Sequence, residues 1–326
     1  MLKNIKKISL ILLVILTVGI LTSCKGIEFE NQKLVTAKEL PRGEAMIFVA
    51  EEKNKYANRF NSQIWNLKSG DGSQFFKDYV VHTVKKFVEK IMLLKLIAND
   101  LNVIVSPKDD ELIENAAIEY KTMLSTADIE FIGCSDEDIY NAFRDYHLSR
   151  LVIDNLSKNA SSEISISEAK VIDVQYIVLN DIELARKTAE DVRAKGASFS
   201  YFAKTRSLDT NIEMLIKRGD ENSIKFPELF YISKGQISDI LVYRDKYYIF
   251  KCISDYIPEE TEKRRLEILK SMKNNEFEVN FQRFDDKYRV FSNSSYWKEI
   301  DLSAGDDSDI TEFENIYYKY FPKKIK

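Results

Sequence analysis

Histidine and cysteine, which supply many of the metal ligands and nucleophiles in proteins, are scarce in this sequence. Among its 326 residues are two histidines, His82 and His147, and three cysteines, Cys24, Cys134 and Cys252. None of the five stands at a spacing typical of a metal site, and the G-x-S-x-G, P-loop, H-E-x-x-H and C-x-x-C motifs are missing. We therefore expect no metal and no cofactor. Both histidines are predicted to be structural, and Cys134 and Cys252 to be buried and unpaired.

The composition narrows the class of protein further. Only 10 glycines and 5 prolines are present, whereas the two make up roughly 12% of an average protein, so long helices are favoured over an all-β fold. All 52 acidic side chains, and all but three of the 48 basic ones, follow residue 23, so the bulk of the chain is more acidic than its formal net charge of −4. Such a surface does not neutralise phosphates, and we expect no nucleic-acid binding.

The first 24 residues have the layout of an export signal. Basic Met1–Lys7 is followed by the almost continuous apolar run Ile8–Leu21, which is short for a membrane span because a transmembrane helix needs about 20 apolar residues. Leu21-Thr22-Ser23-Cys24 then resembles the lipobox of bacterial lipoproteins. That resemblance implies cleavage before Cys24 and a diacylglycerol on its sulfur, which would anchor the protein to the outer face of the cell membrane. An ordinary signal peptide or an uncleaved anchor is the alternative.

Between about residues 38 and 157 the apolar residues repeat at helical spacings. A first helix with a single apolar face is predicted from Met46, Val49, Ala50, Ala57, Phe60 and Ile64, and a second, Ser73–Leu101, from Phe76, Val80, Val84, Phe87, Ile91, Leu94, Ala98 and Leu101. Ser69–Gly72 is predicted to separate the two. Ser106 before Pro107, and Ser135 before three acidic residues, are typical of the N-caps of two more helices.

The pattern changes at about residue 170. Val171–Leu179 is rich in β-branched residues and predicts a buried strand. The predicted elements after it are a helix Ile182–Lys195 ended by Gly196, a short helix Phe199–Thr205, a strand Glu213–Lys217, a short helix Phe226–Tyr231, and a hairpin of Ile240–Tyr243 with Tyr247–Ile253 across Arg244-Asp245. A charged helix from Pro258 to about Tyr288 and a polar tail with Tyr296, Trp297 and Phe313 follow. The chain is therefore expected to be α+β.

Short motifs in this region resemble those of the parvulin family of peptidyl-prolyl isomerases. Gly196-Ala197-Ser198-Phe199 with Ala203 is similar to its G-x-x-F…A junction, Ser207-Leu208-Asp209 to its S-x-D, Lys234-Gly235-Gln236-Ile237-Ser238 to its x-G-x-(I/V)-S, and Tyr247–Lys251 to its final strand. The lipobox and the helices on either side resemble the lipoprotein foldases of Gram-positive bacteria, which share the layout of the periplasmic chaperone SurA. The resemblance implies a mostly helical chaperone domain with an inserted parvulin-like β-α-α-β-α-β-β domain.

The implied domains are a signal peptide (1–23), a tether (24–37), a helical chaperone domain (38–167), a parvulin-like domain (168–256), and a helix and tail (257–326) that return to the chaperone domain. The implied function is that of a membrane-anchored foldase outside the cell membrane. Its partners would be unfolded or newly secreted polypeptides and their X-Pro segments, and a homodimer stays open.

The resemblance also implies the site residues. Asp209 stands at the family's central Asp/Cys position, while Tyr176 and Tyr248 stand where active parvulins have histidines. Phe230 matches the second phenylalanine of the substrate pocket, and Phe226 is one position out of register with the first. Tyrosine can order a hydrogen-bond network but titrates near ~10, so it stays neutral where histidine can switch. Isomerase activity, a catalytically inactive holdase chaperone, and a ligand-binding or structural lipoprotein all remain open.

Overall fold

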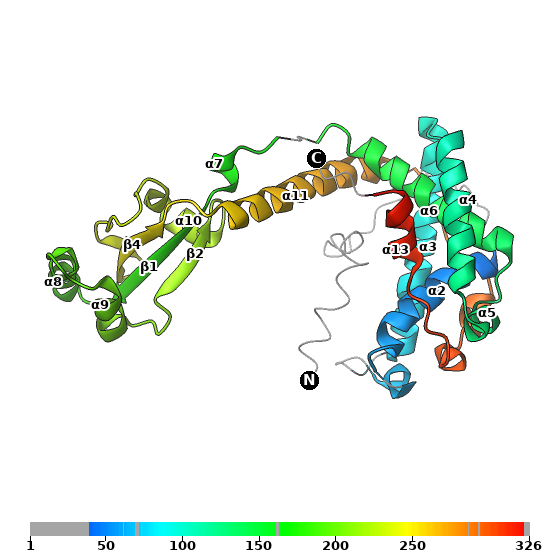
Figure 1. Cartoon of the computed structure of the whole chain (residues 1–326), viewed down its shortest axis with the longest axis horizontal. Helices are drawn as coiled ribbons and strands as arrows, with labels where there is room; N and C mark the ends of the chain where they lie inside the picture. The colour runs from blue at the N-terminus through cyan, green and yellow to red at the C-terminus, as the bar shows by residue number, and fades with distance from the viewer. Residues whose placement is uncertain are drawn as a thin grey trace, which may run out of the picture. The chain divides into compact units, whose positions relative to one another are not determined.

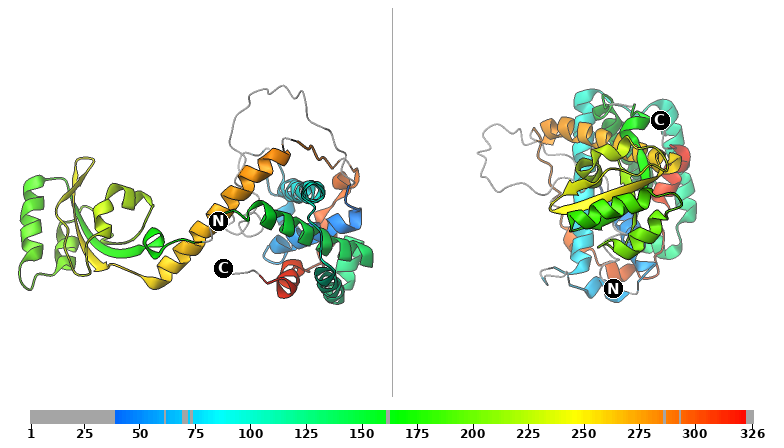
Figure 2. Two further views of the ribbon diagram at one scale, coloured as in Figure 1. Left: turned by 90° about the horizontal axis from the view of Figure 1, so that it is seen from above. Right: turned by 90° about the vertical axis from the view of Figure 1, so that its left-hand side faces the viewer.

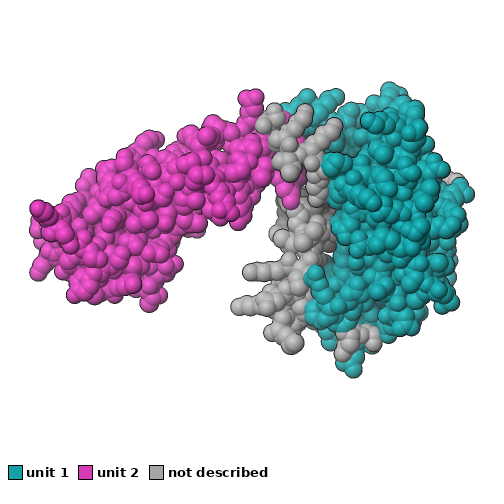
Figure 3. Space-filling model, viewed as in Figure 1, with its two compact units in different colours: residues 1–159, 276–326 teal, residues 160–275 magenta. Residues whose placement is uncertain are grey.

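The computed structural model describes residues 39–60, 62–68, 72, 74–160, 163–285, 287–292 and 294–322. The predicted signal peptide and tether, with Cys24, lie outside them, as does most of the predicted break at Ser69–Gly72. The chain divides into two units (Figure 3): unit 1 comprises residues 1–159 and 276–326, and unit 2 comprises residues 160–275. Within the described ranges, no helix is both long enough and apolar enough to cross a membrane.

Unit 1 is a bundle of helices that are far apart in the sequence (Figure 1). Its elements are α2 (Arg42–Ala57), η2 (Ser62–Asn66), α3 (Phe76–Leu101), α4 (Pro107–Met123), α5 (Thr126–Ile132), α6 (Asp136–Leu156), α12 (Tyr296–Glu299), η4 (Leu302–Gly305) and α13 (Phe313–Tyr320). Both predicted N-caps are confirmed, because Ser106 Oγ accepts the N–H of Asp109 and Ser135 Oγ that of Asp138, each at 3.1 Å.

Helix α2 differs from its prediction in length and in surroundings. It ends at Ala57, so Phe60 and Ile64 are not part of it, and it is buried all round instead of on one apolar face. Even its polar Lys53 and Asn54 are 0% exposed. The physical reason is that α2 runs through the middle of unit 1, against α3, α5 and α6, so that its polar positions face protein rather than water.

The buried polar groups of α2 bind the backbone of the chain's last part. Lys53 Nζ donates hydrogen bonds to the carbonyls of Gly305 and Ser308, and Asn54 Nδ2 donates to the carbonyl of Ile310 at 2.9 Å. These bonds satisfy groups that would otherwise be costly to bury. They also explain why α2 keeps polar residues in a core position.

Two carboxylates continue this set of bonds. Asp128 Oδ1 accepts the N–H groups of Asp309 (3.1 Å) and Ile310 (3.3 Å), and Glu51 Oε1 accepts the N–H of Phe313 (3.1 Å). Residues 294–322, the C-terminal segment from here on, are therefore an integral part of unit 1.

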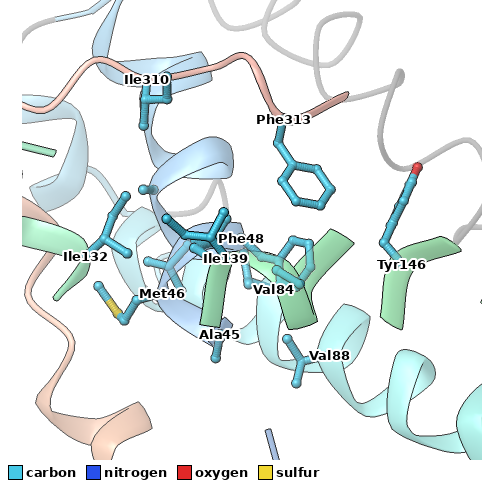
Figure 4. Packing of buried hydrophobic residues seen from close by; sticks show 14 of the residues in the cluster. Ala45, Met46, Phe48, Val84, Val88, Ile132, Ile139, Tyr146, Ile310 and Phe313 are labelled. Atoms are coloured by element: carbon cyan, nitrogen blue, oxygen red, sulfur yellow. The ribbon is translucent and has the colours of Figure 1, made fainter. Parts of the chain in front are cut away.

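The prediction of a polar tail is wrong for this segment. Its buried apolar side chains are Trp297, Leu302, Ile310, Phe313, Ile316 and Tyr317. Figure 4 shows Ile310 and Phe313 among core residues of the helices, and the Phe313 ring stacks on Phe143 of α6 with 4.1 Å between centroids. Phe313, Ile316 and Tyr317 stand at helical spacing and form the buried face of α13, a signal that the sequence analysis missed, whereas Trp297, Leu302 and Ile310 follow no period.

Unit 2 is built on a four-stranded antiparallel sheet with the strand order β2-β1-β4-β3 (Figures 1 and 2). Its elements are α7 (Ile166–Ala169), β1 (Val171–Leu179), α8 (Ile182–Arg193), α9 (Phe199–Arg206), β2 (Glu213–Lys217), α10 (Glu221–Lys225), η3 (Pro227–Phe230), β3 (Leu241–Tyr243) and β4 (Lys246–Ser254), and α11 (Pro258–Asp285) begins in it. Helices α8 and α9 pack on one face of the sheet, and η3 packs on the other. The predicted α+β class is confirmed.

The strands of unit 2 agree with the sequence better than its short helices do. β1 and β2 have the predicted bounds, and the hairpin turns through Arg244 (φ 48°) and Asp245 (φ 58°), as expected of a two-residue turn. The predicted helix Phe226–Tyr231 is instead the 3₁₀ helix η3, and α10 before it was missed. Helix α8 stops two residues early, before Gly196 at φ 82°.

Two cysteines and both histidines lie among the described residues, and their predicted structural roles can be compared with the structure. Cys252 is buried and free as predicted, but Cys134 is free and only half-buried, so its predicted burial is wrong. His147 is buried in α6, and its Nδ1 lies 3.0 Å from the hydroxyl of Tyr317, a structural contact within unit 1. His82 is exposed on α3.

Candidate functional site

One face of the β1–β4 pair carries both tyrosines that the sequence singled out. In the register of the two strands, Tyr176 lies opposite Phe250 and Val178 lies opposite Tyr248. Residues two apart on a strand point to the same face, so Tyr176 and Tyr248 are diagonal neighbours. The pairing of β1 with β4 therefore brings these two tyrosines together, although they are far apart in the sequence.

The loop between α9 and β2 brings the acidic residue to this face. The N–H of Leu208 donates to the carbonyl of Val178 at 2.9 Å, and the N–H of Tyr176 donates to the carbonyl of Ile212 at 2.8 Å. These backbone bonds fasten the loop alongside the C-terminal half of β1. Asp209, between the two fastened points, is exposed and lies beside Tyr176.

A hydrogen bond joins the two groups directly. The hydroxyl of Tyr176 donates to Oδ2 of Asp209 at 3.1 Å. Burial, reinforced by the Asp209 charge, raises the pKa of Tyr176 to about 12. Burial and then the same carboxylate also raise the pKa of Tyr248. Both phenols are therefore neutral near pH 7 and act as hydrogen-bond donors or acceptors.

Aromatic rings form the floor beneath these polar groups. The Phe226 ring lies 4.9 Å, centroid to centroid, from both Tyr248 and Phe250. Phe230 belongs to the same apolar cluster, and the Arg218 guanidinium lies 4.3 Å from its ring centroid. Phe226 is only 4% exposed and Phe230 only 6%. The structure thus groups Tyr176, Asp209, Tyr248 and Phe226, but it covers the two phenylalanine rings.

Two members of this cluster were missed from the sequence. Phe250 is fully buried and separates Tyr176 from Phe226. Ser207 Oγ accepts the N–H of Val178 at 3.1 Å, which helps to fix the loop. Phe250 could have been found from strand alternation, since it lies two residues after Tyr248. The bond of Ser207 depends on the path of the loop, for which the sequence holds no periodic signal.

Metal binding finds no support at this site. Over the parts of the chain that the structure describes, no group of three or more His, Cys, Asp or Glu side chains is arranged to hold a metal ion. The chemistry available to the site is therefore that of hydrogen bonds, one carboxylate and an aromatic floor.

Comparisons with known proteins place similar chains among foldases. No protein-family model matches the sequence, and no curated protein matches it. Among solved structures, the chain is similar to a peptidylprolyl isomerase (PrsA) from Bacillus cereus, with 17% identity over 80% of this chain and 100% of the other and a TM-score of 0.38. It is also similar to PrsA from Bacillus anthracis (17% identity, 64% and 100% covered, TM-score 0.32) and to foldase protein PrsA from Streptococcus pneumoniae (16% identity, 72% and 97% covered, TM-score 0.27).

Proposed function

We propose that the protein is an extracytoplasmic foldase that binds unfolded polypeptides through unit 1 and acts on X-Pro peptide bonds through unit 2. The observation that carries the second part is the cluster of Tyr176, Asp209 and Tyr248 over the Phe226 ring. It places hydrogen-bonding groups directly beside a buried aromatic floor at one place on the sheet.

Prolyl isomerisation breaks no bond and needs no cofactor. Its barrier is the loss of amide resonance, about 18–20 kcal/mol for a peptide bond, so a catalyst must favour the twisted amide over the planar one. A desolvating apolar surface and a hydrogen-bond donor near the rotating carbonyl supply such preference. The Phe226 ring and a tyrosine hydroxyl are groups of these two kinds.

The two tyrosines have different roles in this proposal. Tyr176 already donates its single O–H to Asp209, which leaves its oxygen only as an acceptor. Among the described residues, no partner is recorded for the hydroxyl of Tyr248. Tyr248 is therefore the donor proposed to contact the prolyl carbonyl, and Tyr176 with Asp209 positions the loop beside it.

The test is a protease-coupled assay of cis–trans exchange in a prolyl tetrapeptide, with residues 25–326. The proposal predicts a rate above the uncatalysed one, and Asp209→Ala should remove most of the increase. An unchanged rate in that variant would show that the site lies elsewhere. A wild-type rate equal to the uncatalysed one would exclude isomerase activity.

A second candidate is a holdase chaperone without catalysis. It is favoured by the burial of Phe226 and Phe230, since rings that are 4% and 6% exposed offer little surface to a proline ring. This candidate predicts suppression of aggregation of a denatured test protein with no effect on prolyl exchange. The two assays together separate the candidates.

Membrane attachment is a further part of the proposal. It rests on the lipobox-like sequence that ends at Cys24, and two lipid chains hold a protein at a membrane where one is marginal. Cys24→Ala should release the protein from membranes into the soluble fraction. Continued tight association of that variant would mean that the apolar run Ile8–Leu21 is itself the anchor.

A further inference from the structure

Unit 1 exposes a group of large apolar side chains where α2 ends and α3 begins. Phe60 is 37% exposed, Leu67 54%, Phe75 38% and Tyr79 39%. The N–H of Phe76 donates to the carbonyl of Leu67 at 2.8 Å, and Lys68 and Phe75 form an antiparallel bridge. Two stretches of chain are thus fastened side by side. We call Leu67, Phe75 and Tyr79, which this pairing and the first turn of α3 bring together, the aromatic patch.

Buried rings support this patch from below. Phe76 lies 5.0 Å from Tyr56, 6.0 Å from Trp65 and 6.1 Å from Tyr79, centroid to centroid. Trp65 is fully buried. The Tyr79 ring is therefore held against a packed base, while backbone bonds fix the positions of Leu67 and Phe75, so a ligand would meet a preorganised apolar surface with little ordering cost.

Two lysines lie over the Phe75 ring although the chain as a whole is acidic, and the exposed Asp78 is the neighbouring acidic residue on α3. The ammonium groups of Lys68 and Lys77 lie 5.3 Å and 5.9 Å from the centroid of the Phe75 ring. Neither lysine has an ion-pair partner among the described residues. An apolar surface with two unpaired cations fits a ligand that carries both apolar side chains and carboxylates.

The size of the patch favours a short segment as its ligand. Three such side chains, between 38% and 54% exposed, offer on the order of 250 Å². A stable dimer buries about 800 Å² on each partner, so a second copy of this chain is too large an occupant for this surface. An extended peptide of a few residues matches it in area.

We propose that the aromatic patch binds short extended segments of unfolded polypeptide in which large apolar side chains stand beside acidic ones. The inference rests on the proposed binding of polypeptides and assigns it a place and a sequence preference. It also separates the task of holding a chain, in unit 1, from any action on X-Pro bonds in unit 2.

The two tryptophans of the chain make binding measurable. Trp65 lies under the patch, whereas Trp297 is buried elsewhere in unit 1 and donates to Ser292 Oγ. In the Trp297→Phe variant of residues 25–326, Trp65 is the remaining tryptophan, so the indole fluorescence reports on Trp65 alone. A peptide with alternating Phe, Leu and Glu should produce a saturable change, its Lys-for-Glu counterpart should bind more weakly, and an all-polar peptide should not bind. Calorimetric titration of the unsubstituted chain repeats the comparison without relying on Trp297→Phe.

Matched variants locate the surface. Phe75 precedes the first residue of α3, a position where serine is favoured, so Phe75→Ser removes the ring without weakening the helix. We expect it to lower the affinity about tenfold, as the loss of one buried aromatic side chain would. Lys77→Glu should reverse the preference for the acidic peptide. Ile118→Ser, on α4 with 56% exposure, is the control and should leave binding unchanged.

The outcomes distinguish this inference from the proposed function. If Phe75→Ser and Lys77→Glu bind the acidic peptide as the unsubstituted chain does, the assignment of the patch is wrong, even where aggregation is still suppressed. If the peptide binds as predicted but aggregation of the test protein is not suppressed, the assignment of the patch is supported and the proposed foldase function is wrong. A concentration-dependent dimer in sedimentation experiments that Phe75→Ser abolishes would overturn the peptide as occupant.

Discussion

The hydroxyl of Tyr176 lies 3.1 Å from Oδ2 of Asp209, and this bond ties the second half of β1 to the loop that follows α9. The residues are 33 positions apart, so only the pairing of the loop with β1 brings them together. The Tyr176 hydroxyl thereby donates its single proton, whereas no acceptor for the Tyr248 hydroxyl lies among the residues that the structure describes. Two nearly equivalent side chains thereby become chemically distinct.

Tyr176→Phe should loosen the loop without disturbing the core. The ring is retained, and only a hydrogen bond to an exposed carboxylate is lost, which costs about 1 kcal/mol of unfolding free energy. If unit 2 acts on prolyl bonds, the rate should fall because Asp209 is no longer positioned. Urea unfolding and the prolyl exchange assay measure the two effects, and a loss of several kcal/mol would contradict the partial exposure of the bond.

Tyr248→Phe should affect activity alone. Over the part of the chain that the structure describes, this hydroxyl has no hydrogen-bond partner, so its removal should leave the free energy of unfolding within about 0.5 kcal/mol of the starting value. Under the proposed mechanism the exchange rate should drop about tenfold or more, because a donor to the rotating carbonyl is lost. A rate equal to that of the unsubstituted chain would remove Tyr248 from the mechanism.

Glu51 should make unit 1 less stable as the pH rises. Burial raises the pKa of Glu51 from 4.5 to about 7, although the N–H of Phe313 and the hydroxyl of Tyr120 donate to it. The folded state thus holds the proton more tightly than the unfolded state does. The contribution of Glu51 to the free energy of unfolding is fully present below pH 4.5. It decreases as the pH rises from 4.5 to about 7 and does not change further above that pH. The total loss is at most about 3 kcal/mol.

Glu51→Gln keeps an oxygen acceptor but cannot titrate, so it should flatten this part of the profile. Urea midpoints between pH 4 and pH 8 measure the change. Glu44→Gln is the comparison variant, because burial and the neighbouring Asp145 carboxylate also raise the pKa of Glu44. Glu44→Gln should change the dependence of the urea midpoint on pH over a different pH range. If the midpoints of both variants and of the parent depend on pH in the same way, neither glutamate governs the pH dependence of stability.

Lys53→Met should release the C-terminal segment. The variant keeps the length of the side chain but leaves the buried carbonyl of Ser308 without its donor and that of Gly305 with only the N–H of Ser308, at about 1–3 kcal/mol in total. Limited proteolysis should then cut after residue 294 faster than in the parent. Lys121→Met is the control, because Lys121 pairs with Asp136 at the surface and should change the unfolding free energy by less than about 1 kcal/mol.

Sequence patterns predicted the strands of unit 2 because a run such as Val171–Leu179 has one local cause, the burial of β-branched side chains. They failed for α2, whose Lys53 and Asn54 look like a solvated face but bind backbone about 250 residues away. No local period contains that information. The grouping of Asp209 with the tyrosines was expected from family resemblance alone, since a loop path fixes it.

The C-terminal segment gives unit 1 an unusual order of assembly. Synthesis from the N-terminus delivers α2 to α6 first, then all of unit 2, and only then the backbone that Lys53, Asn54 and Asp128 bind. Until then these buried groups have only local partners, such as Asn54 for Lys53 and Ser125 for Asp128, so the first helices cannot close fully around them. Unit 2 consists of one continuous stretch and meets no such delay. Unit 2 is therefore expected to fold before unit 1, and the N-terminal helices of unit 1 are expected to complete their packing only when the C-terminal segment is present.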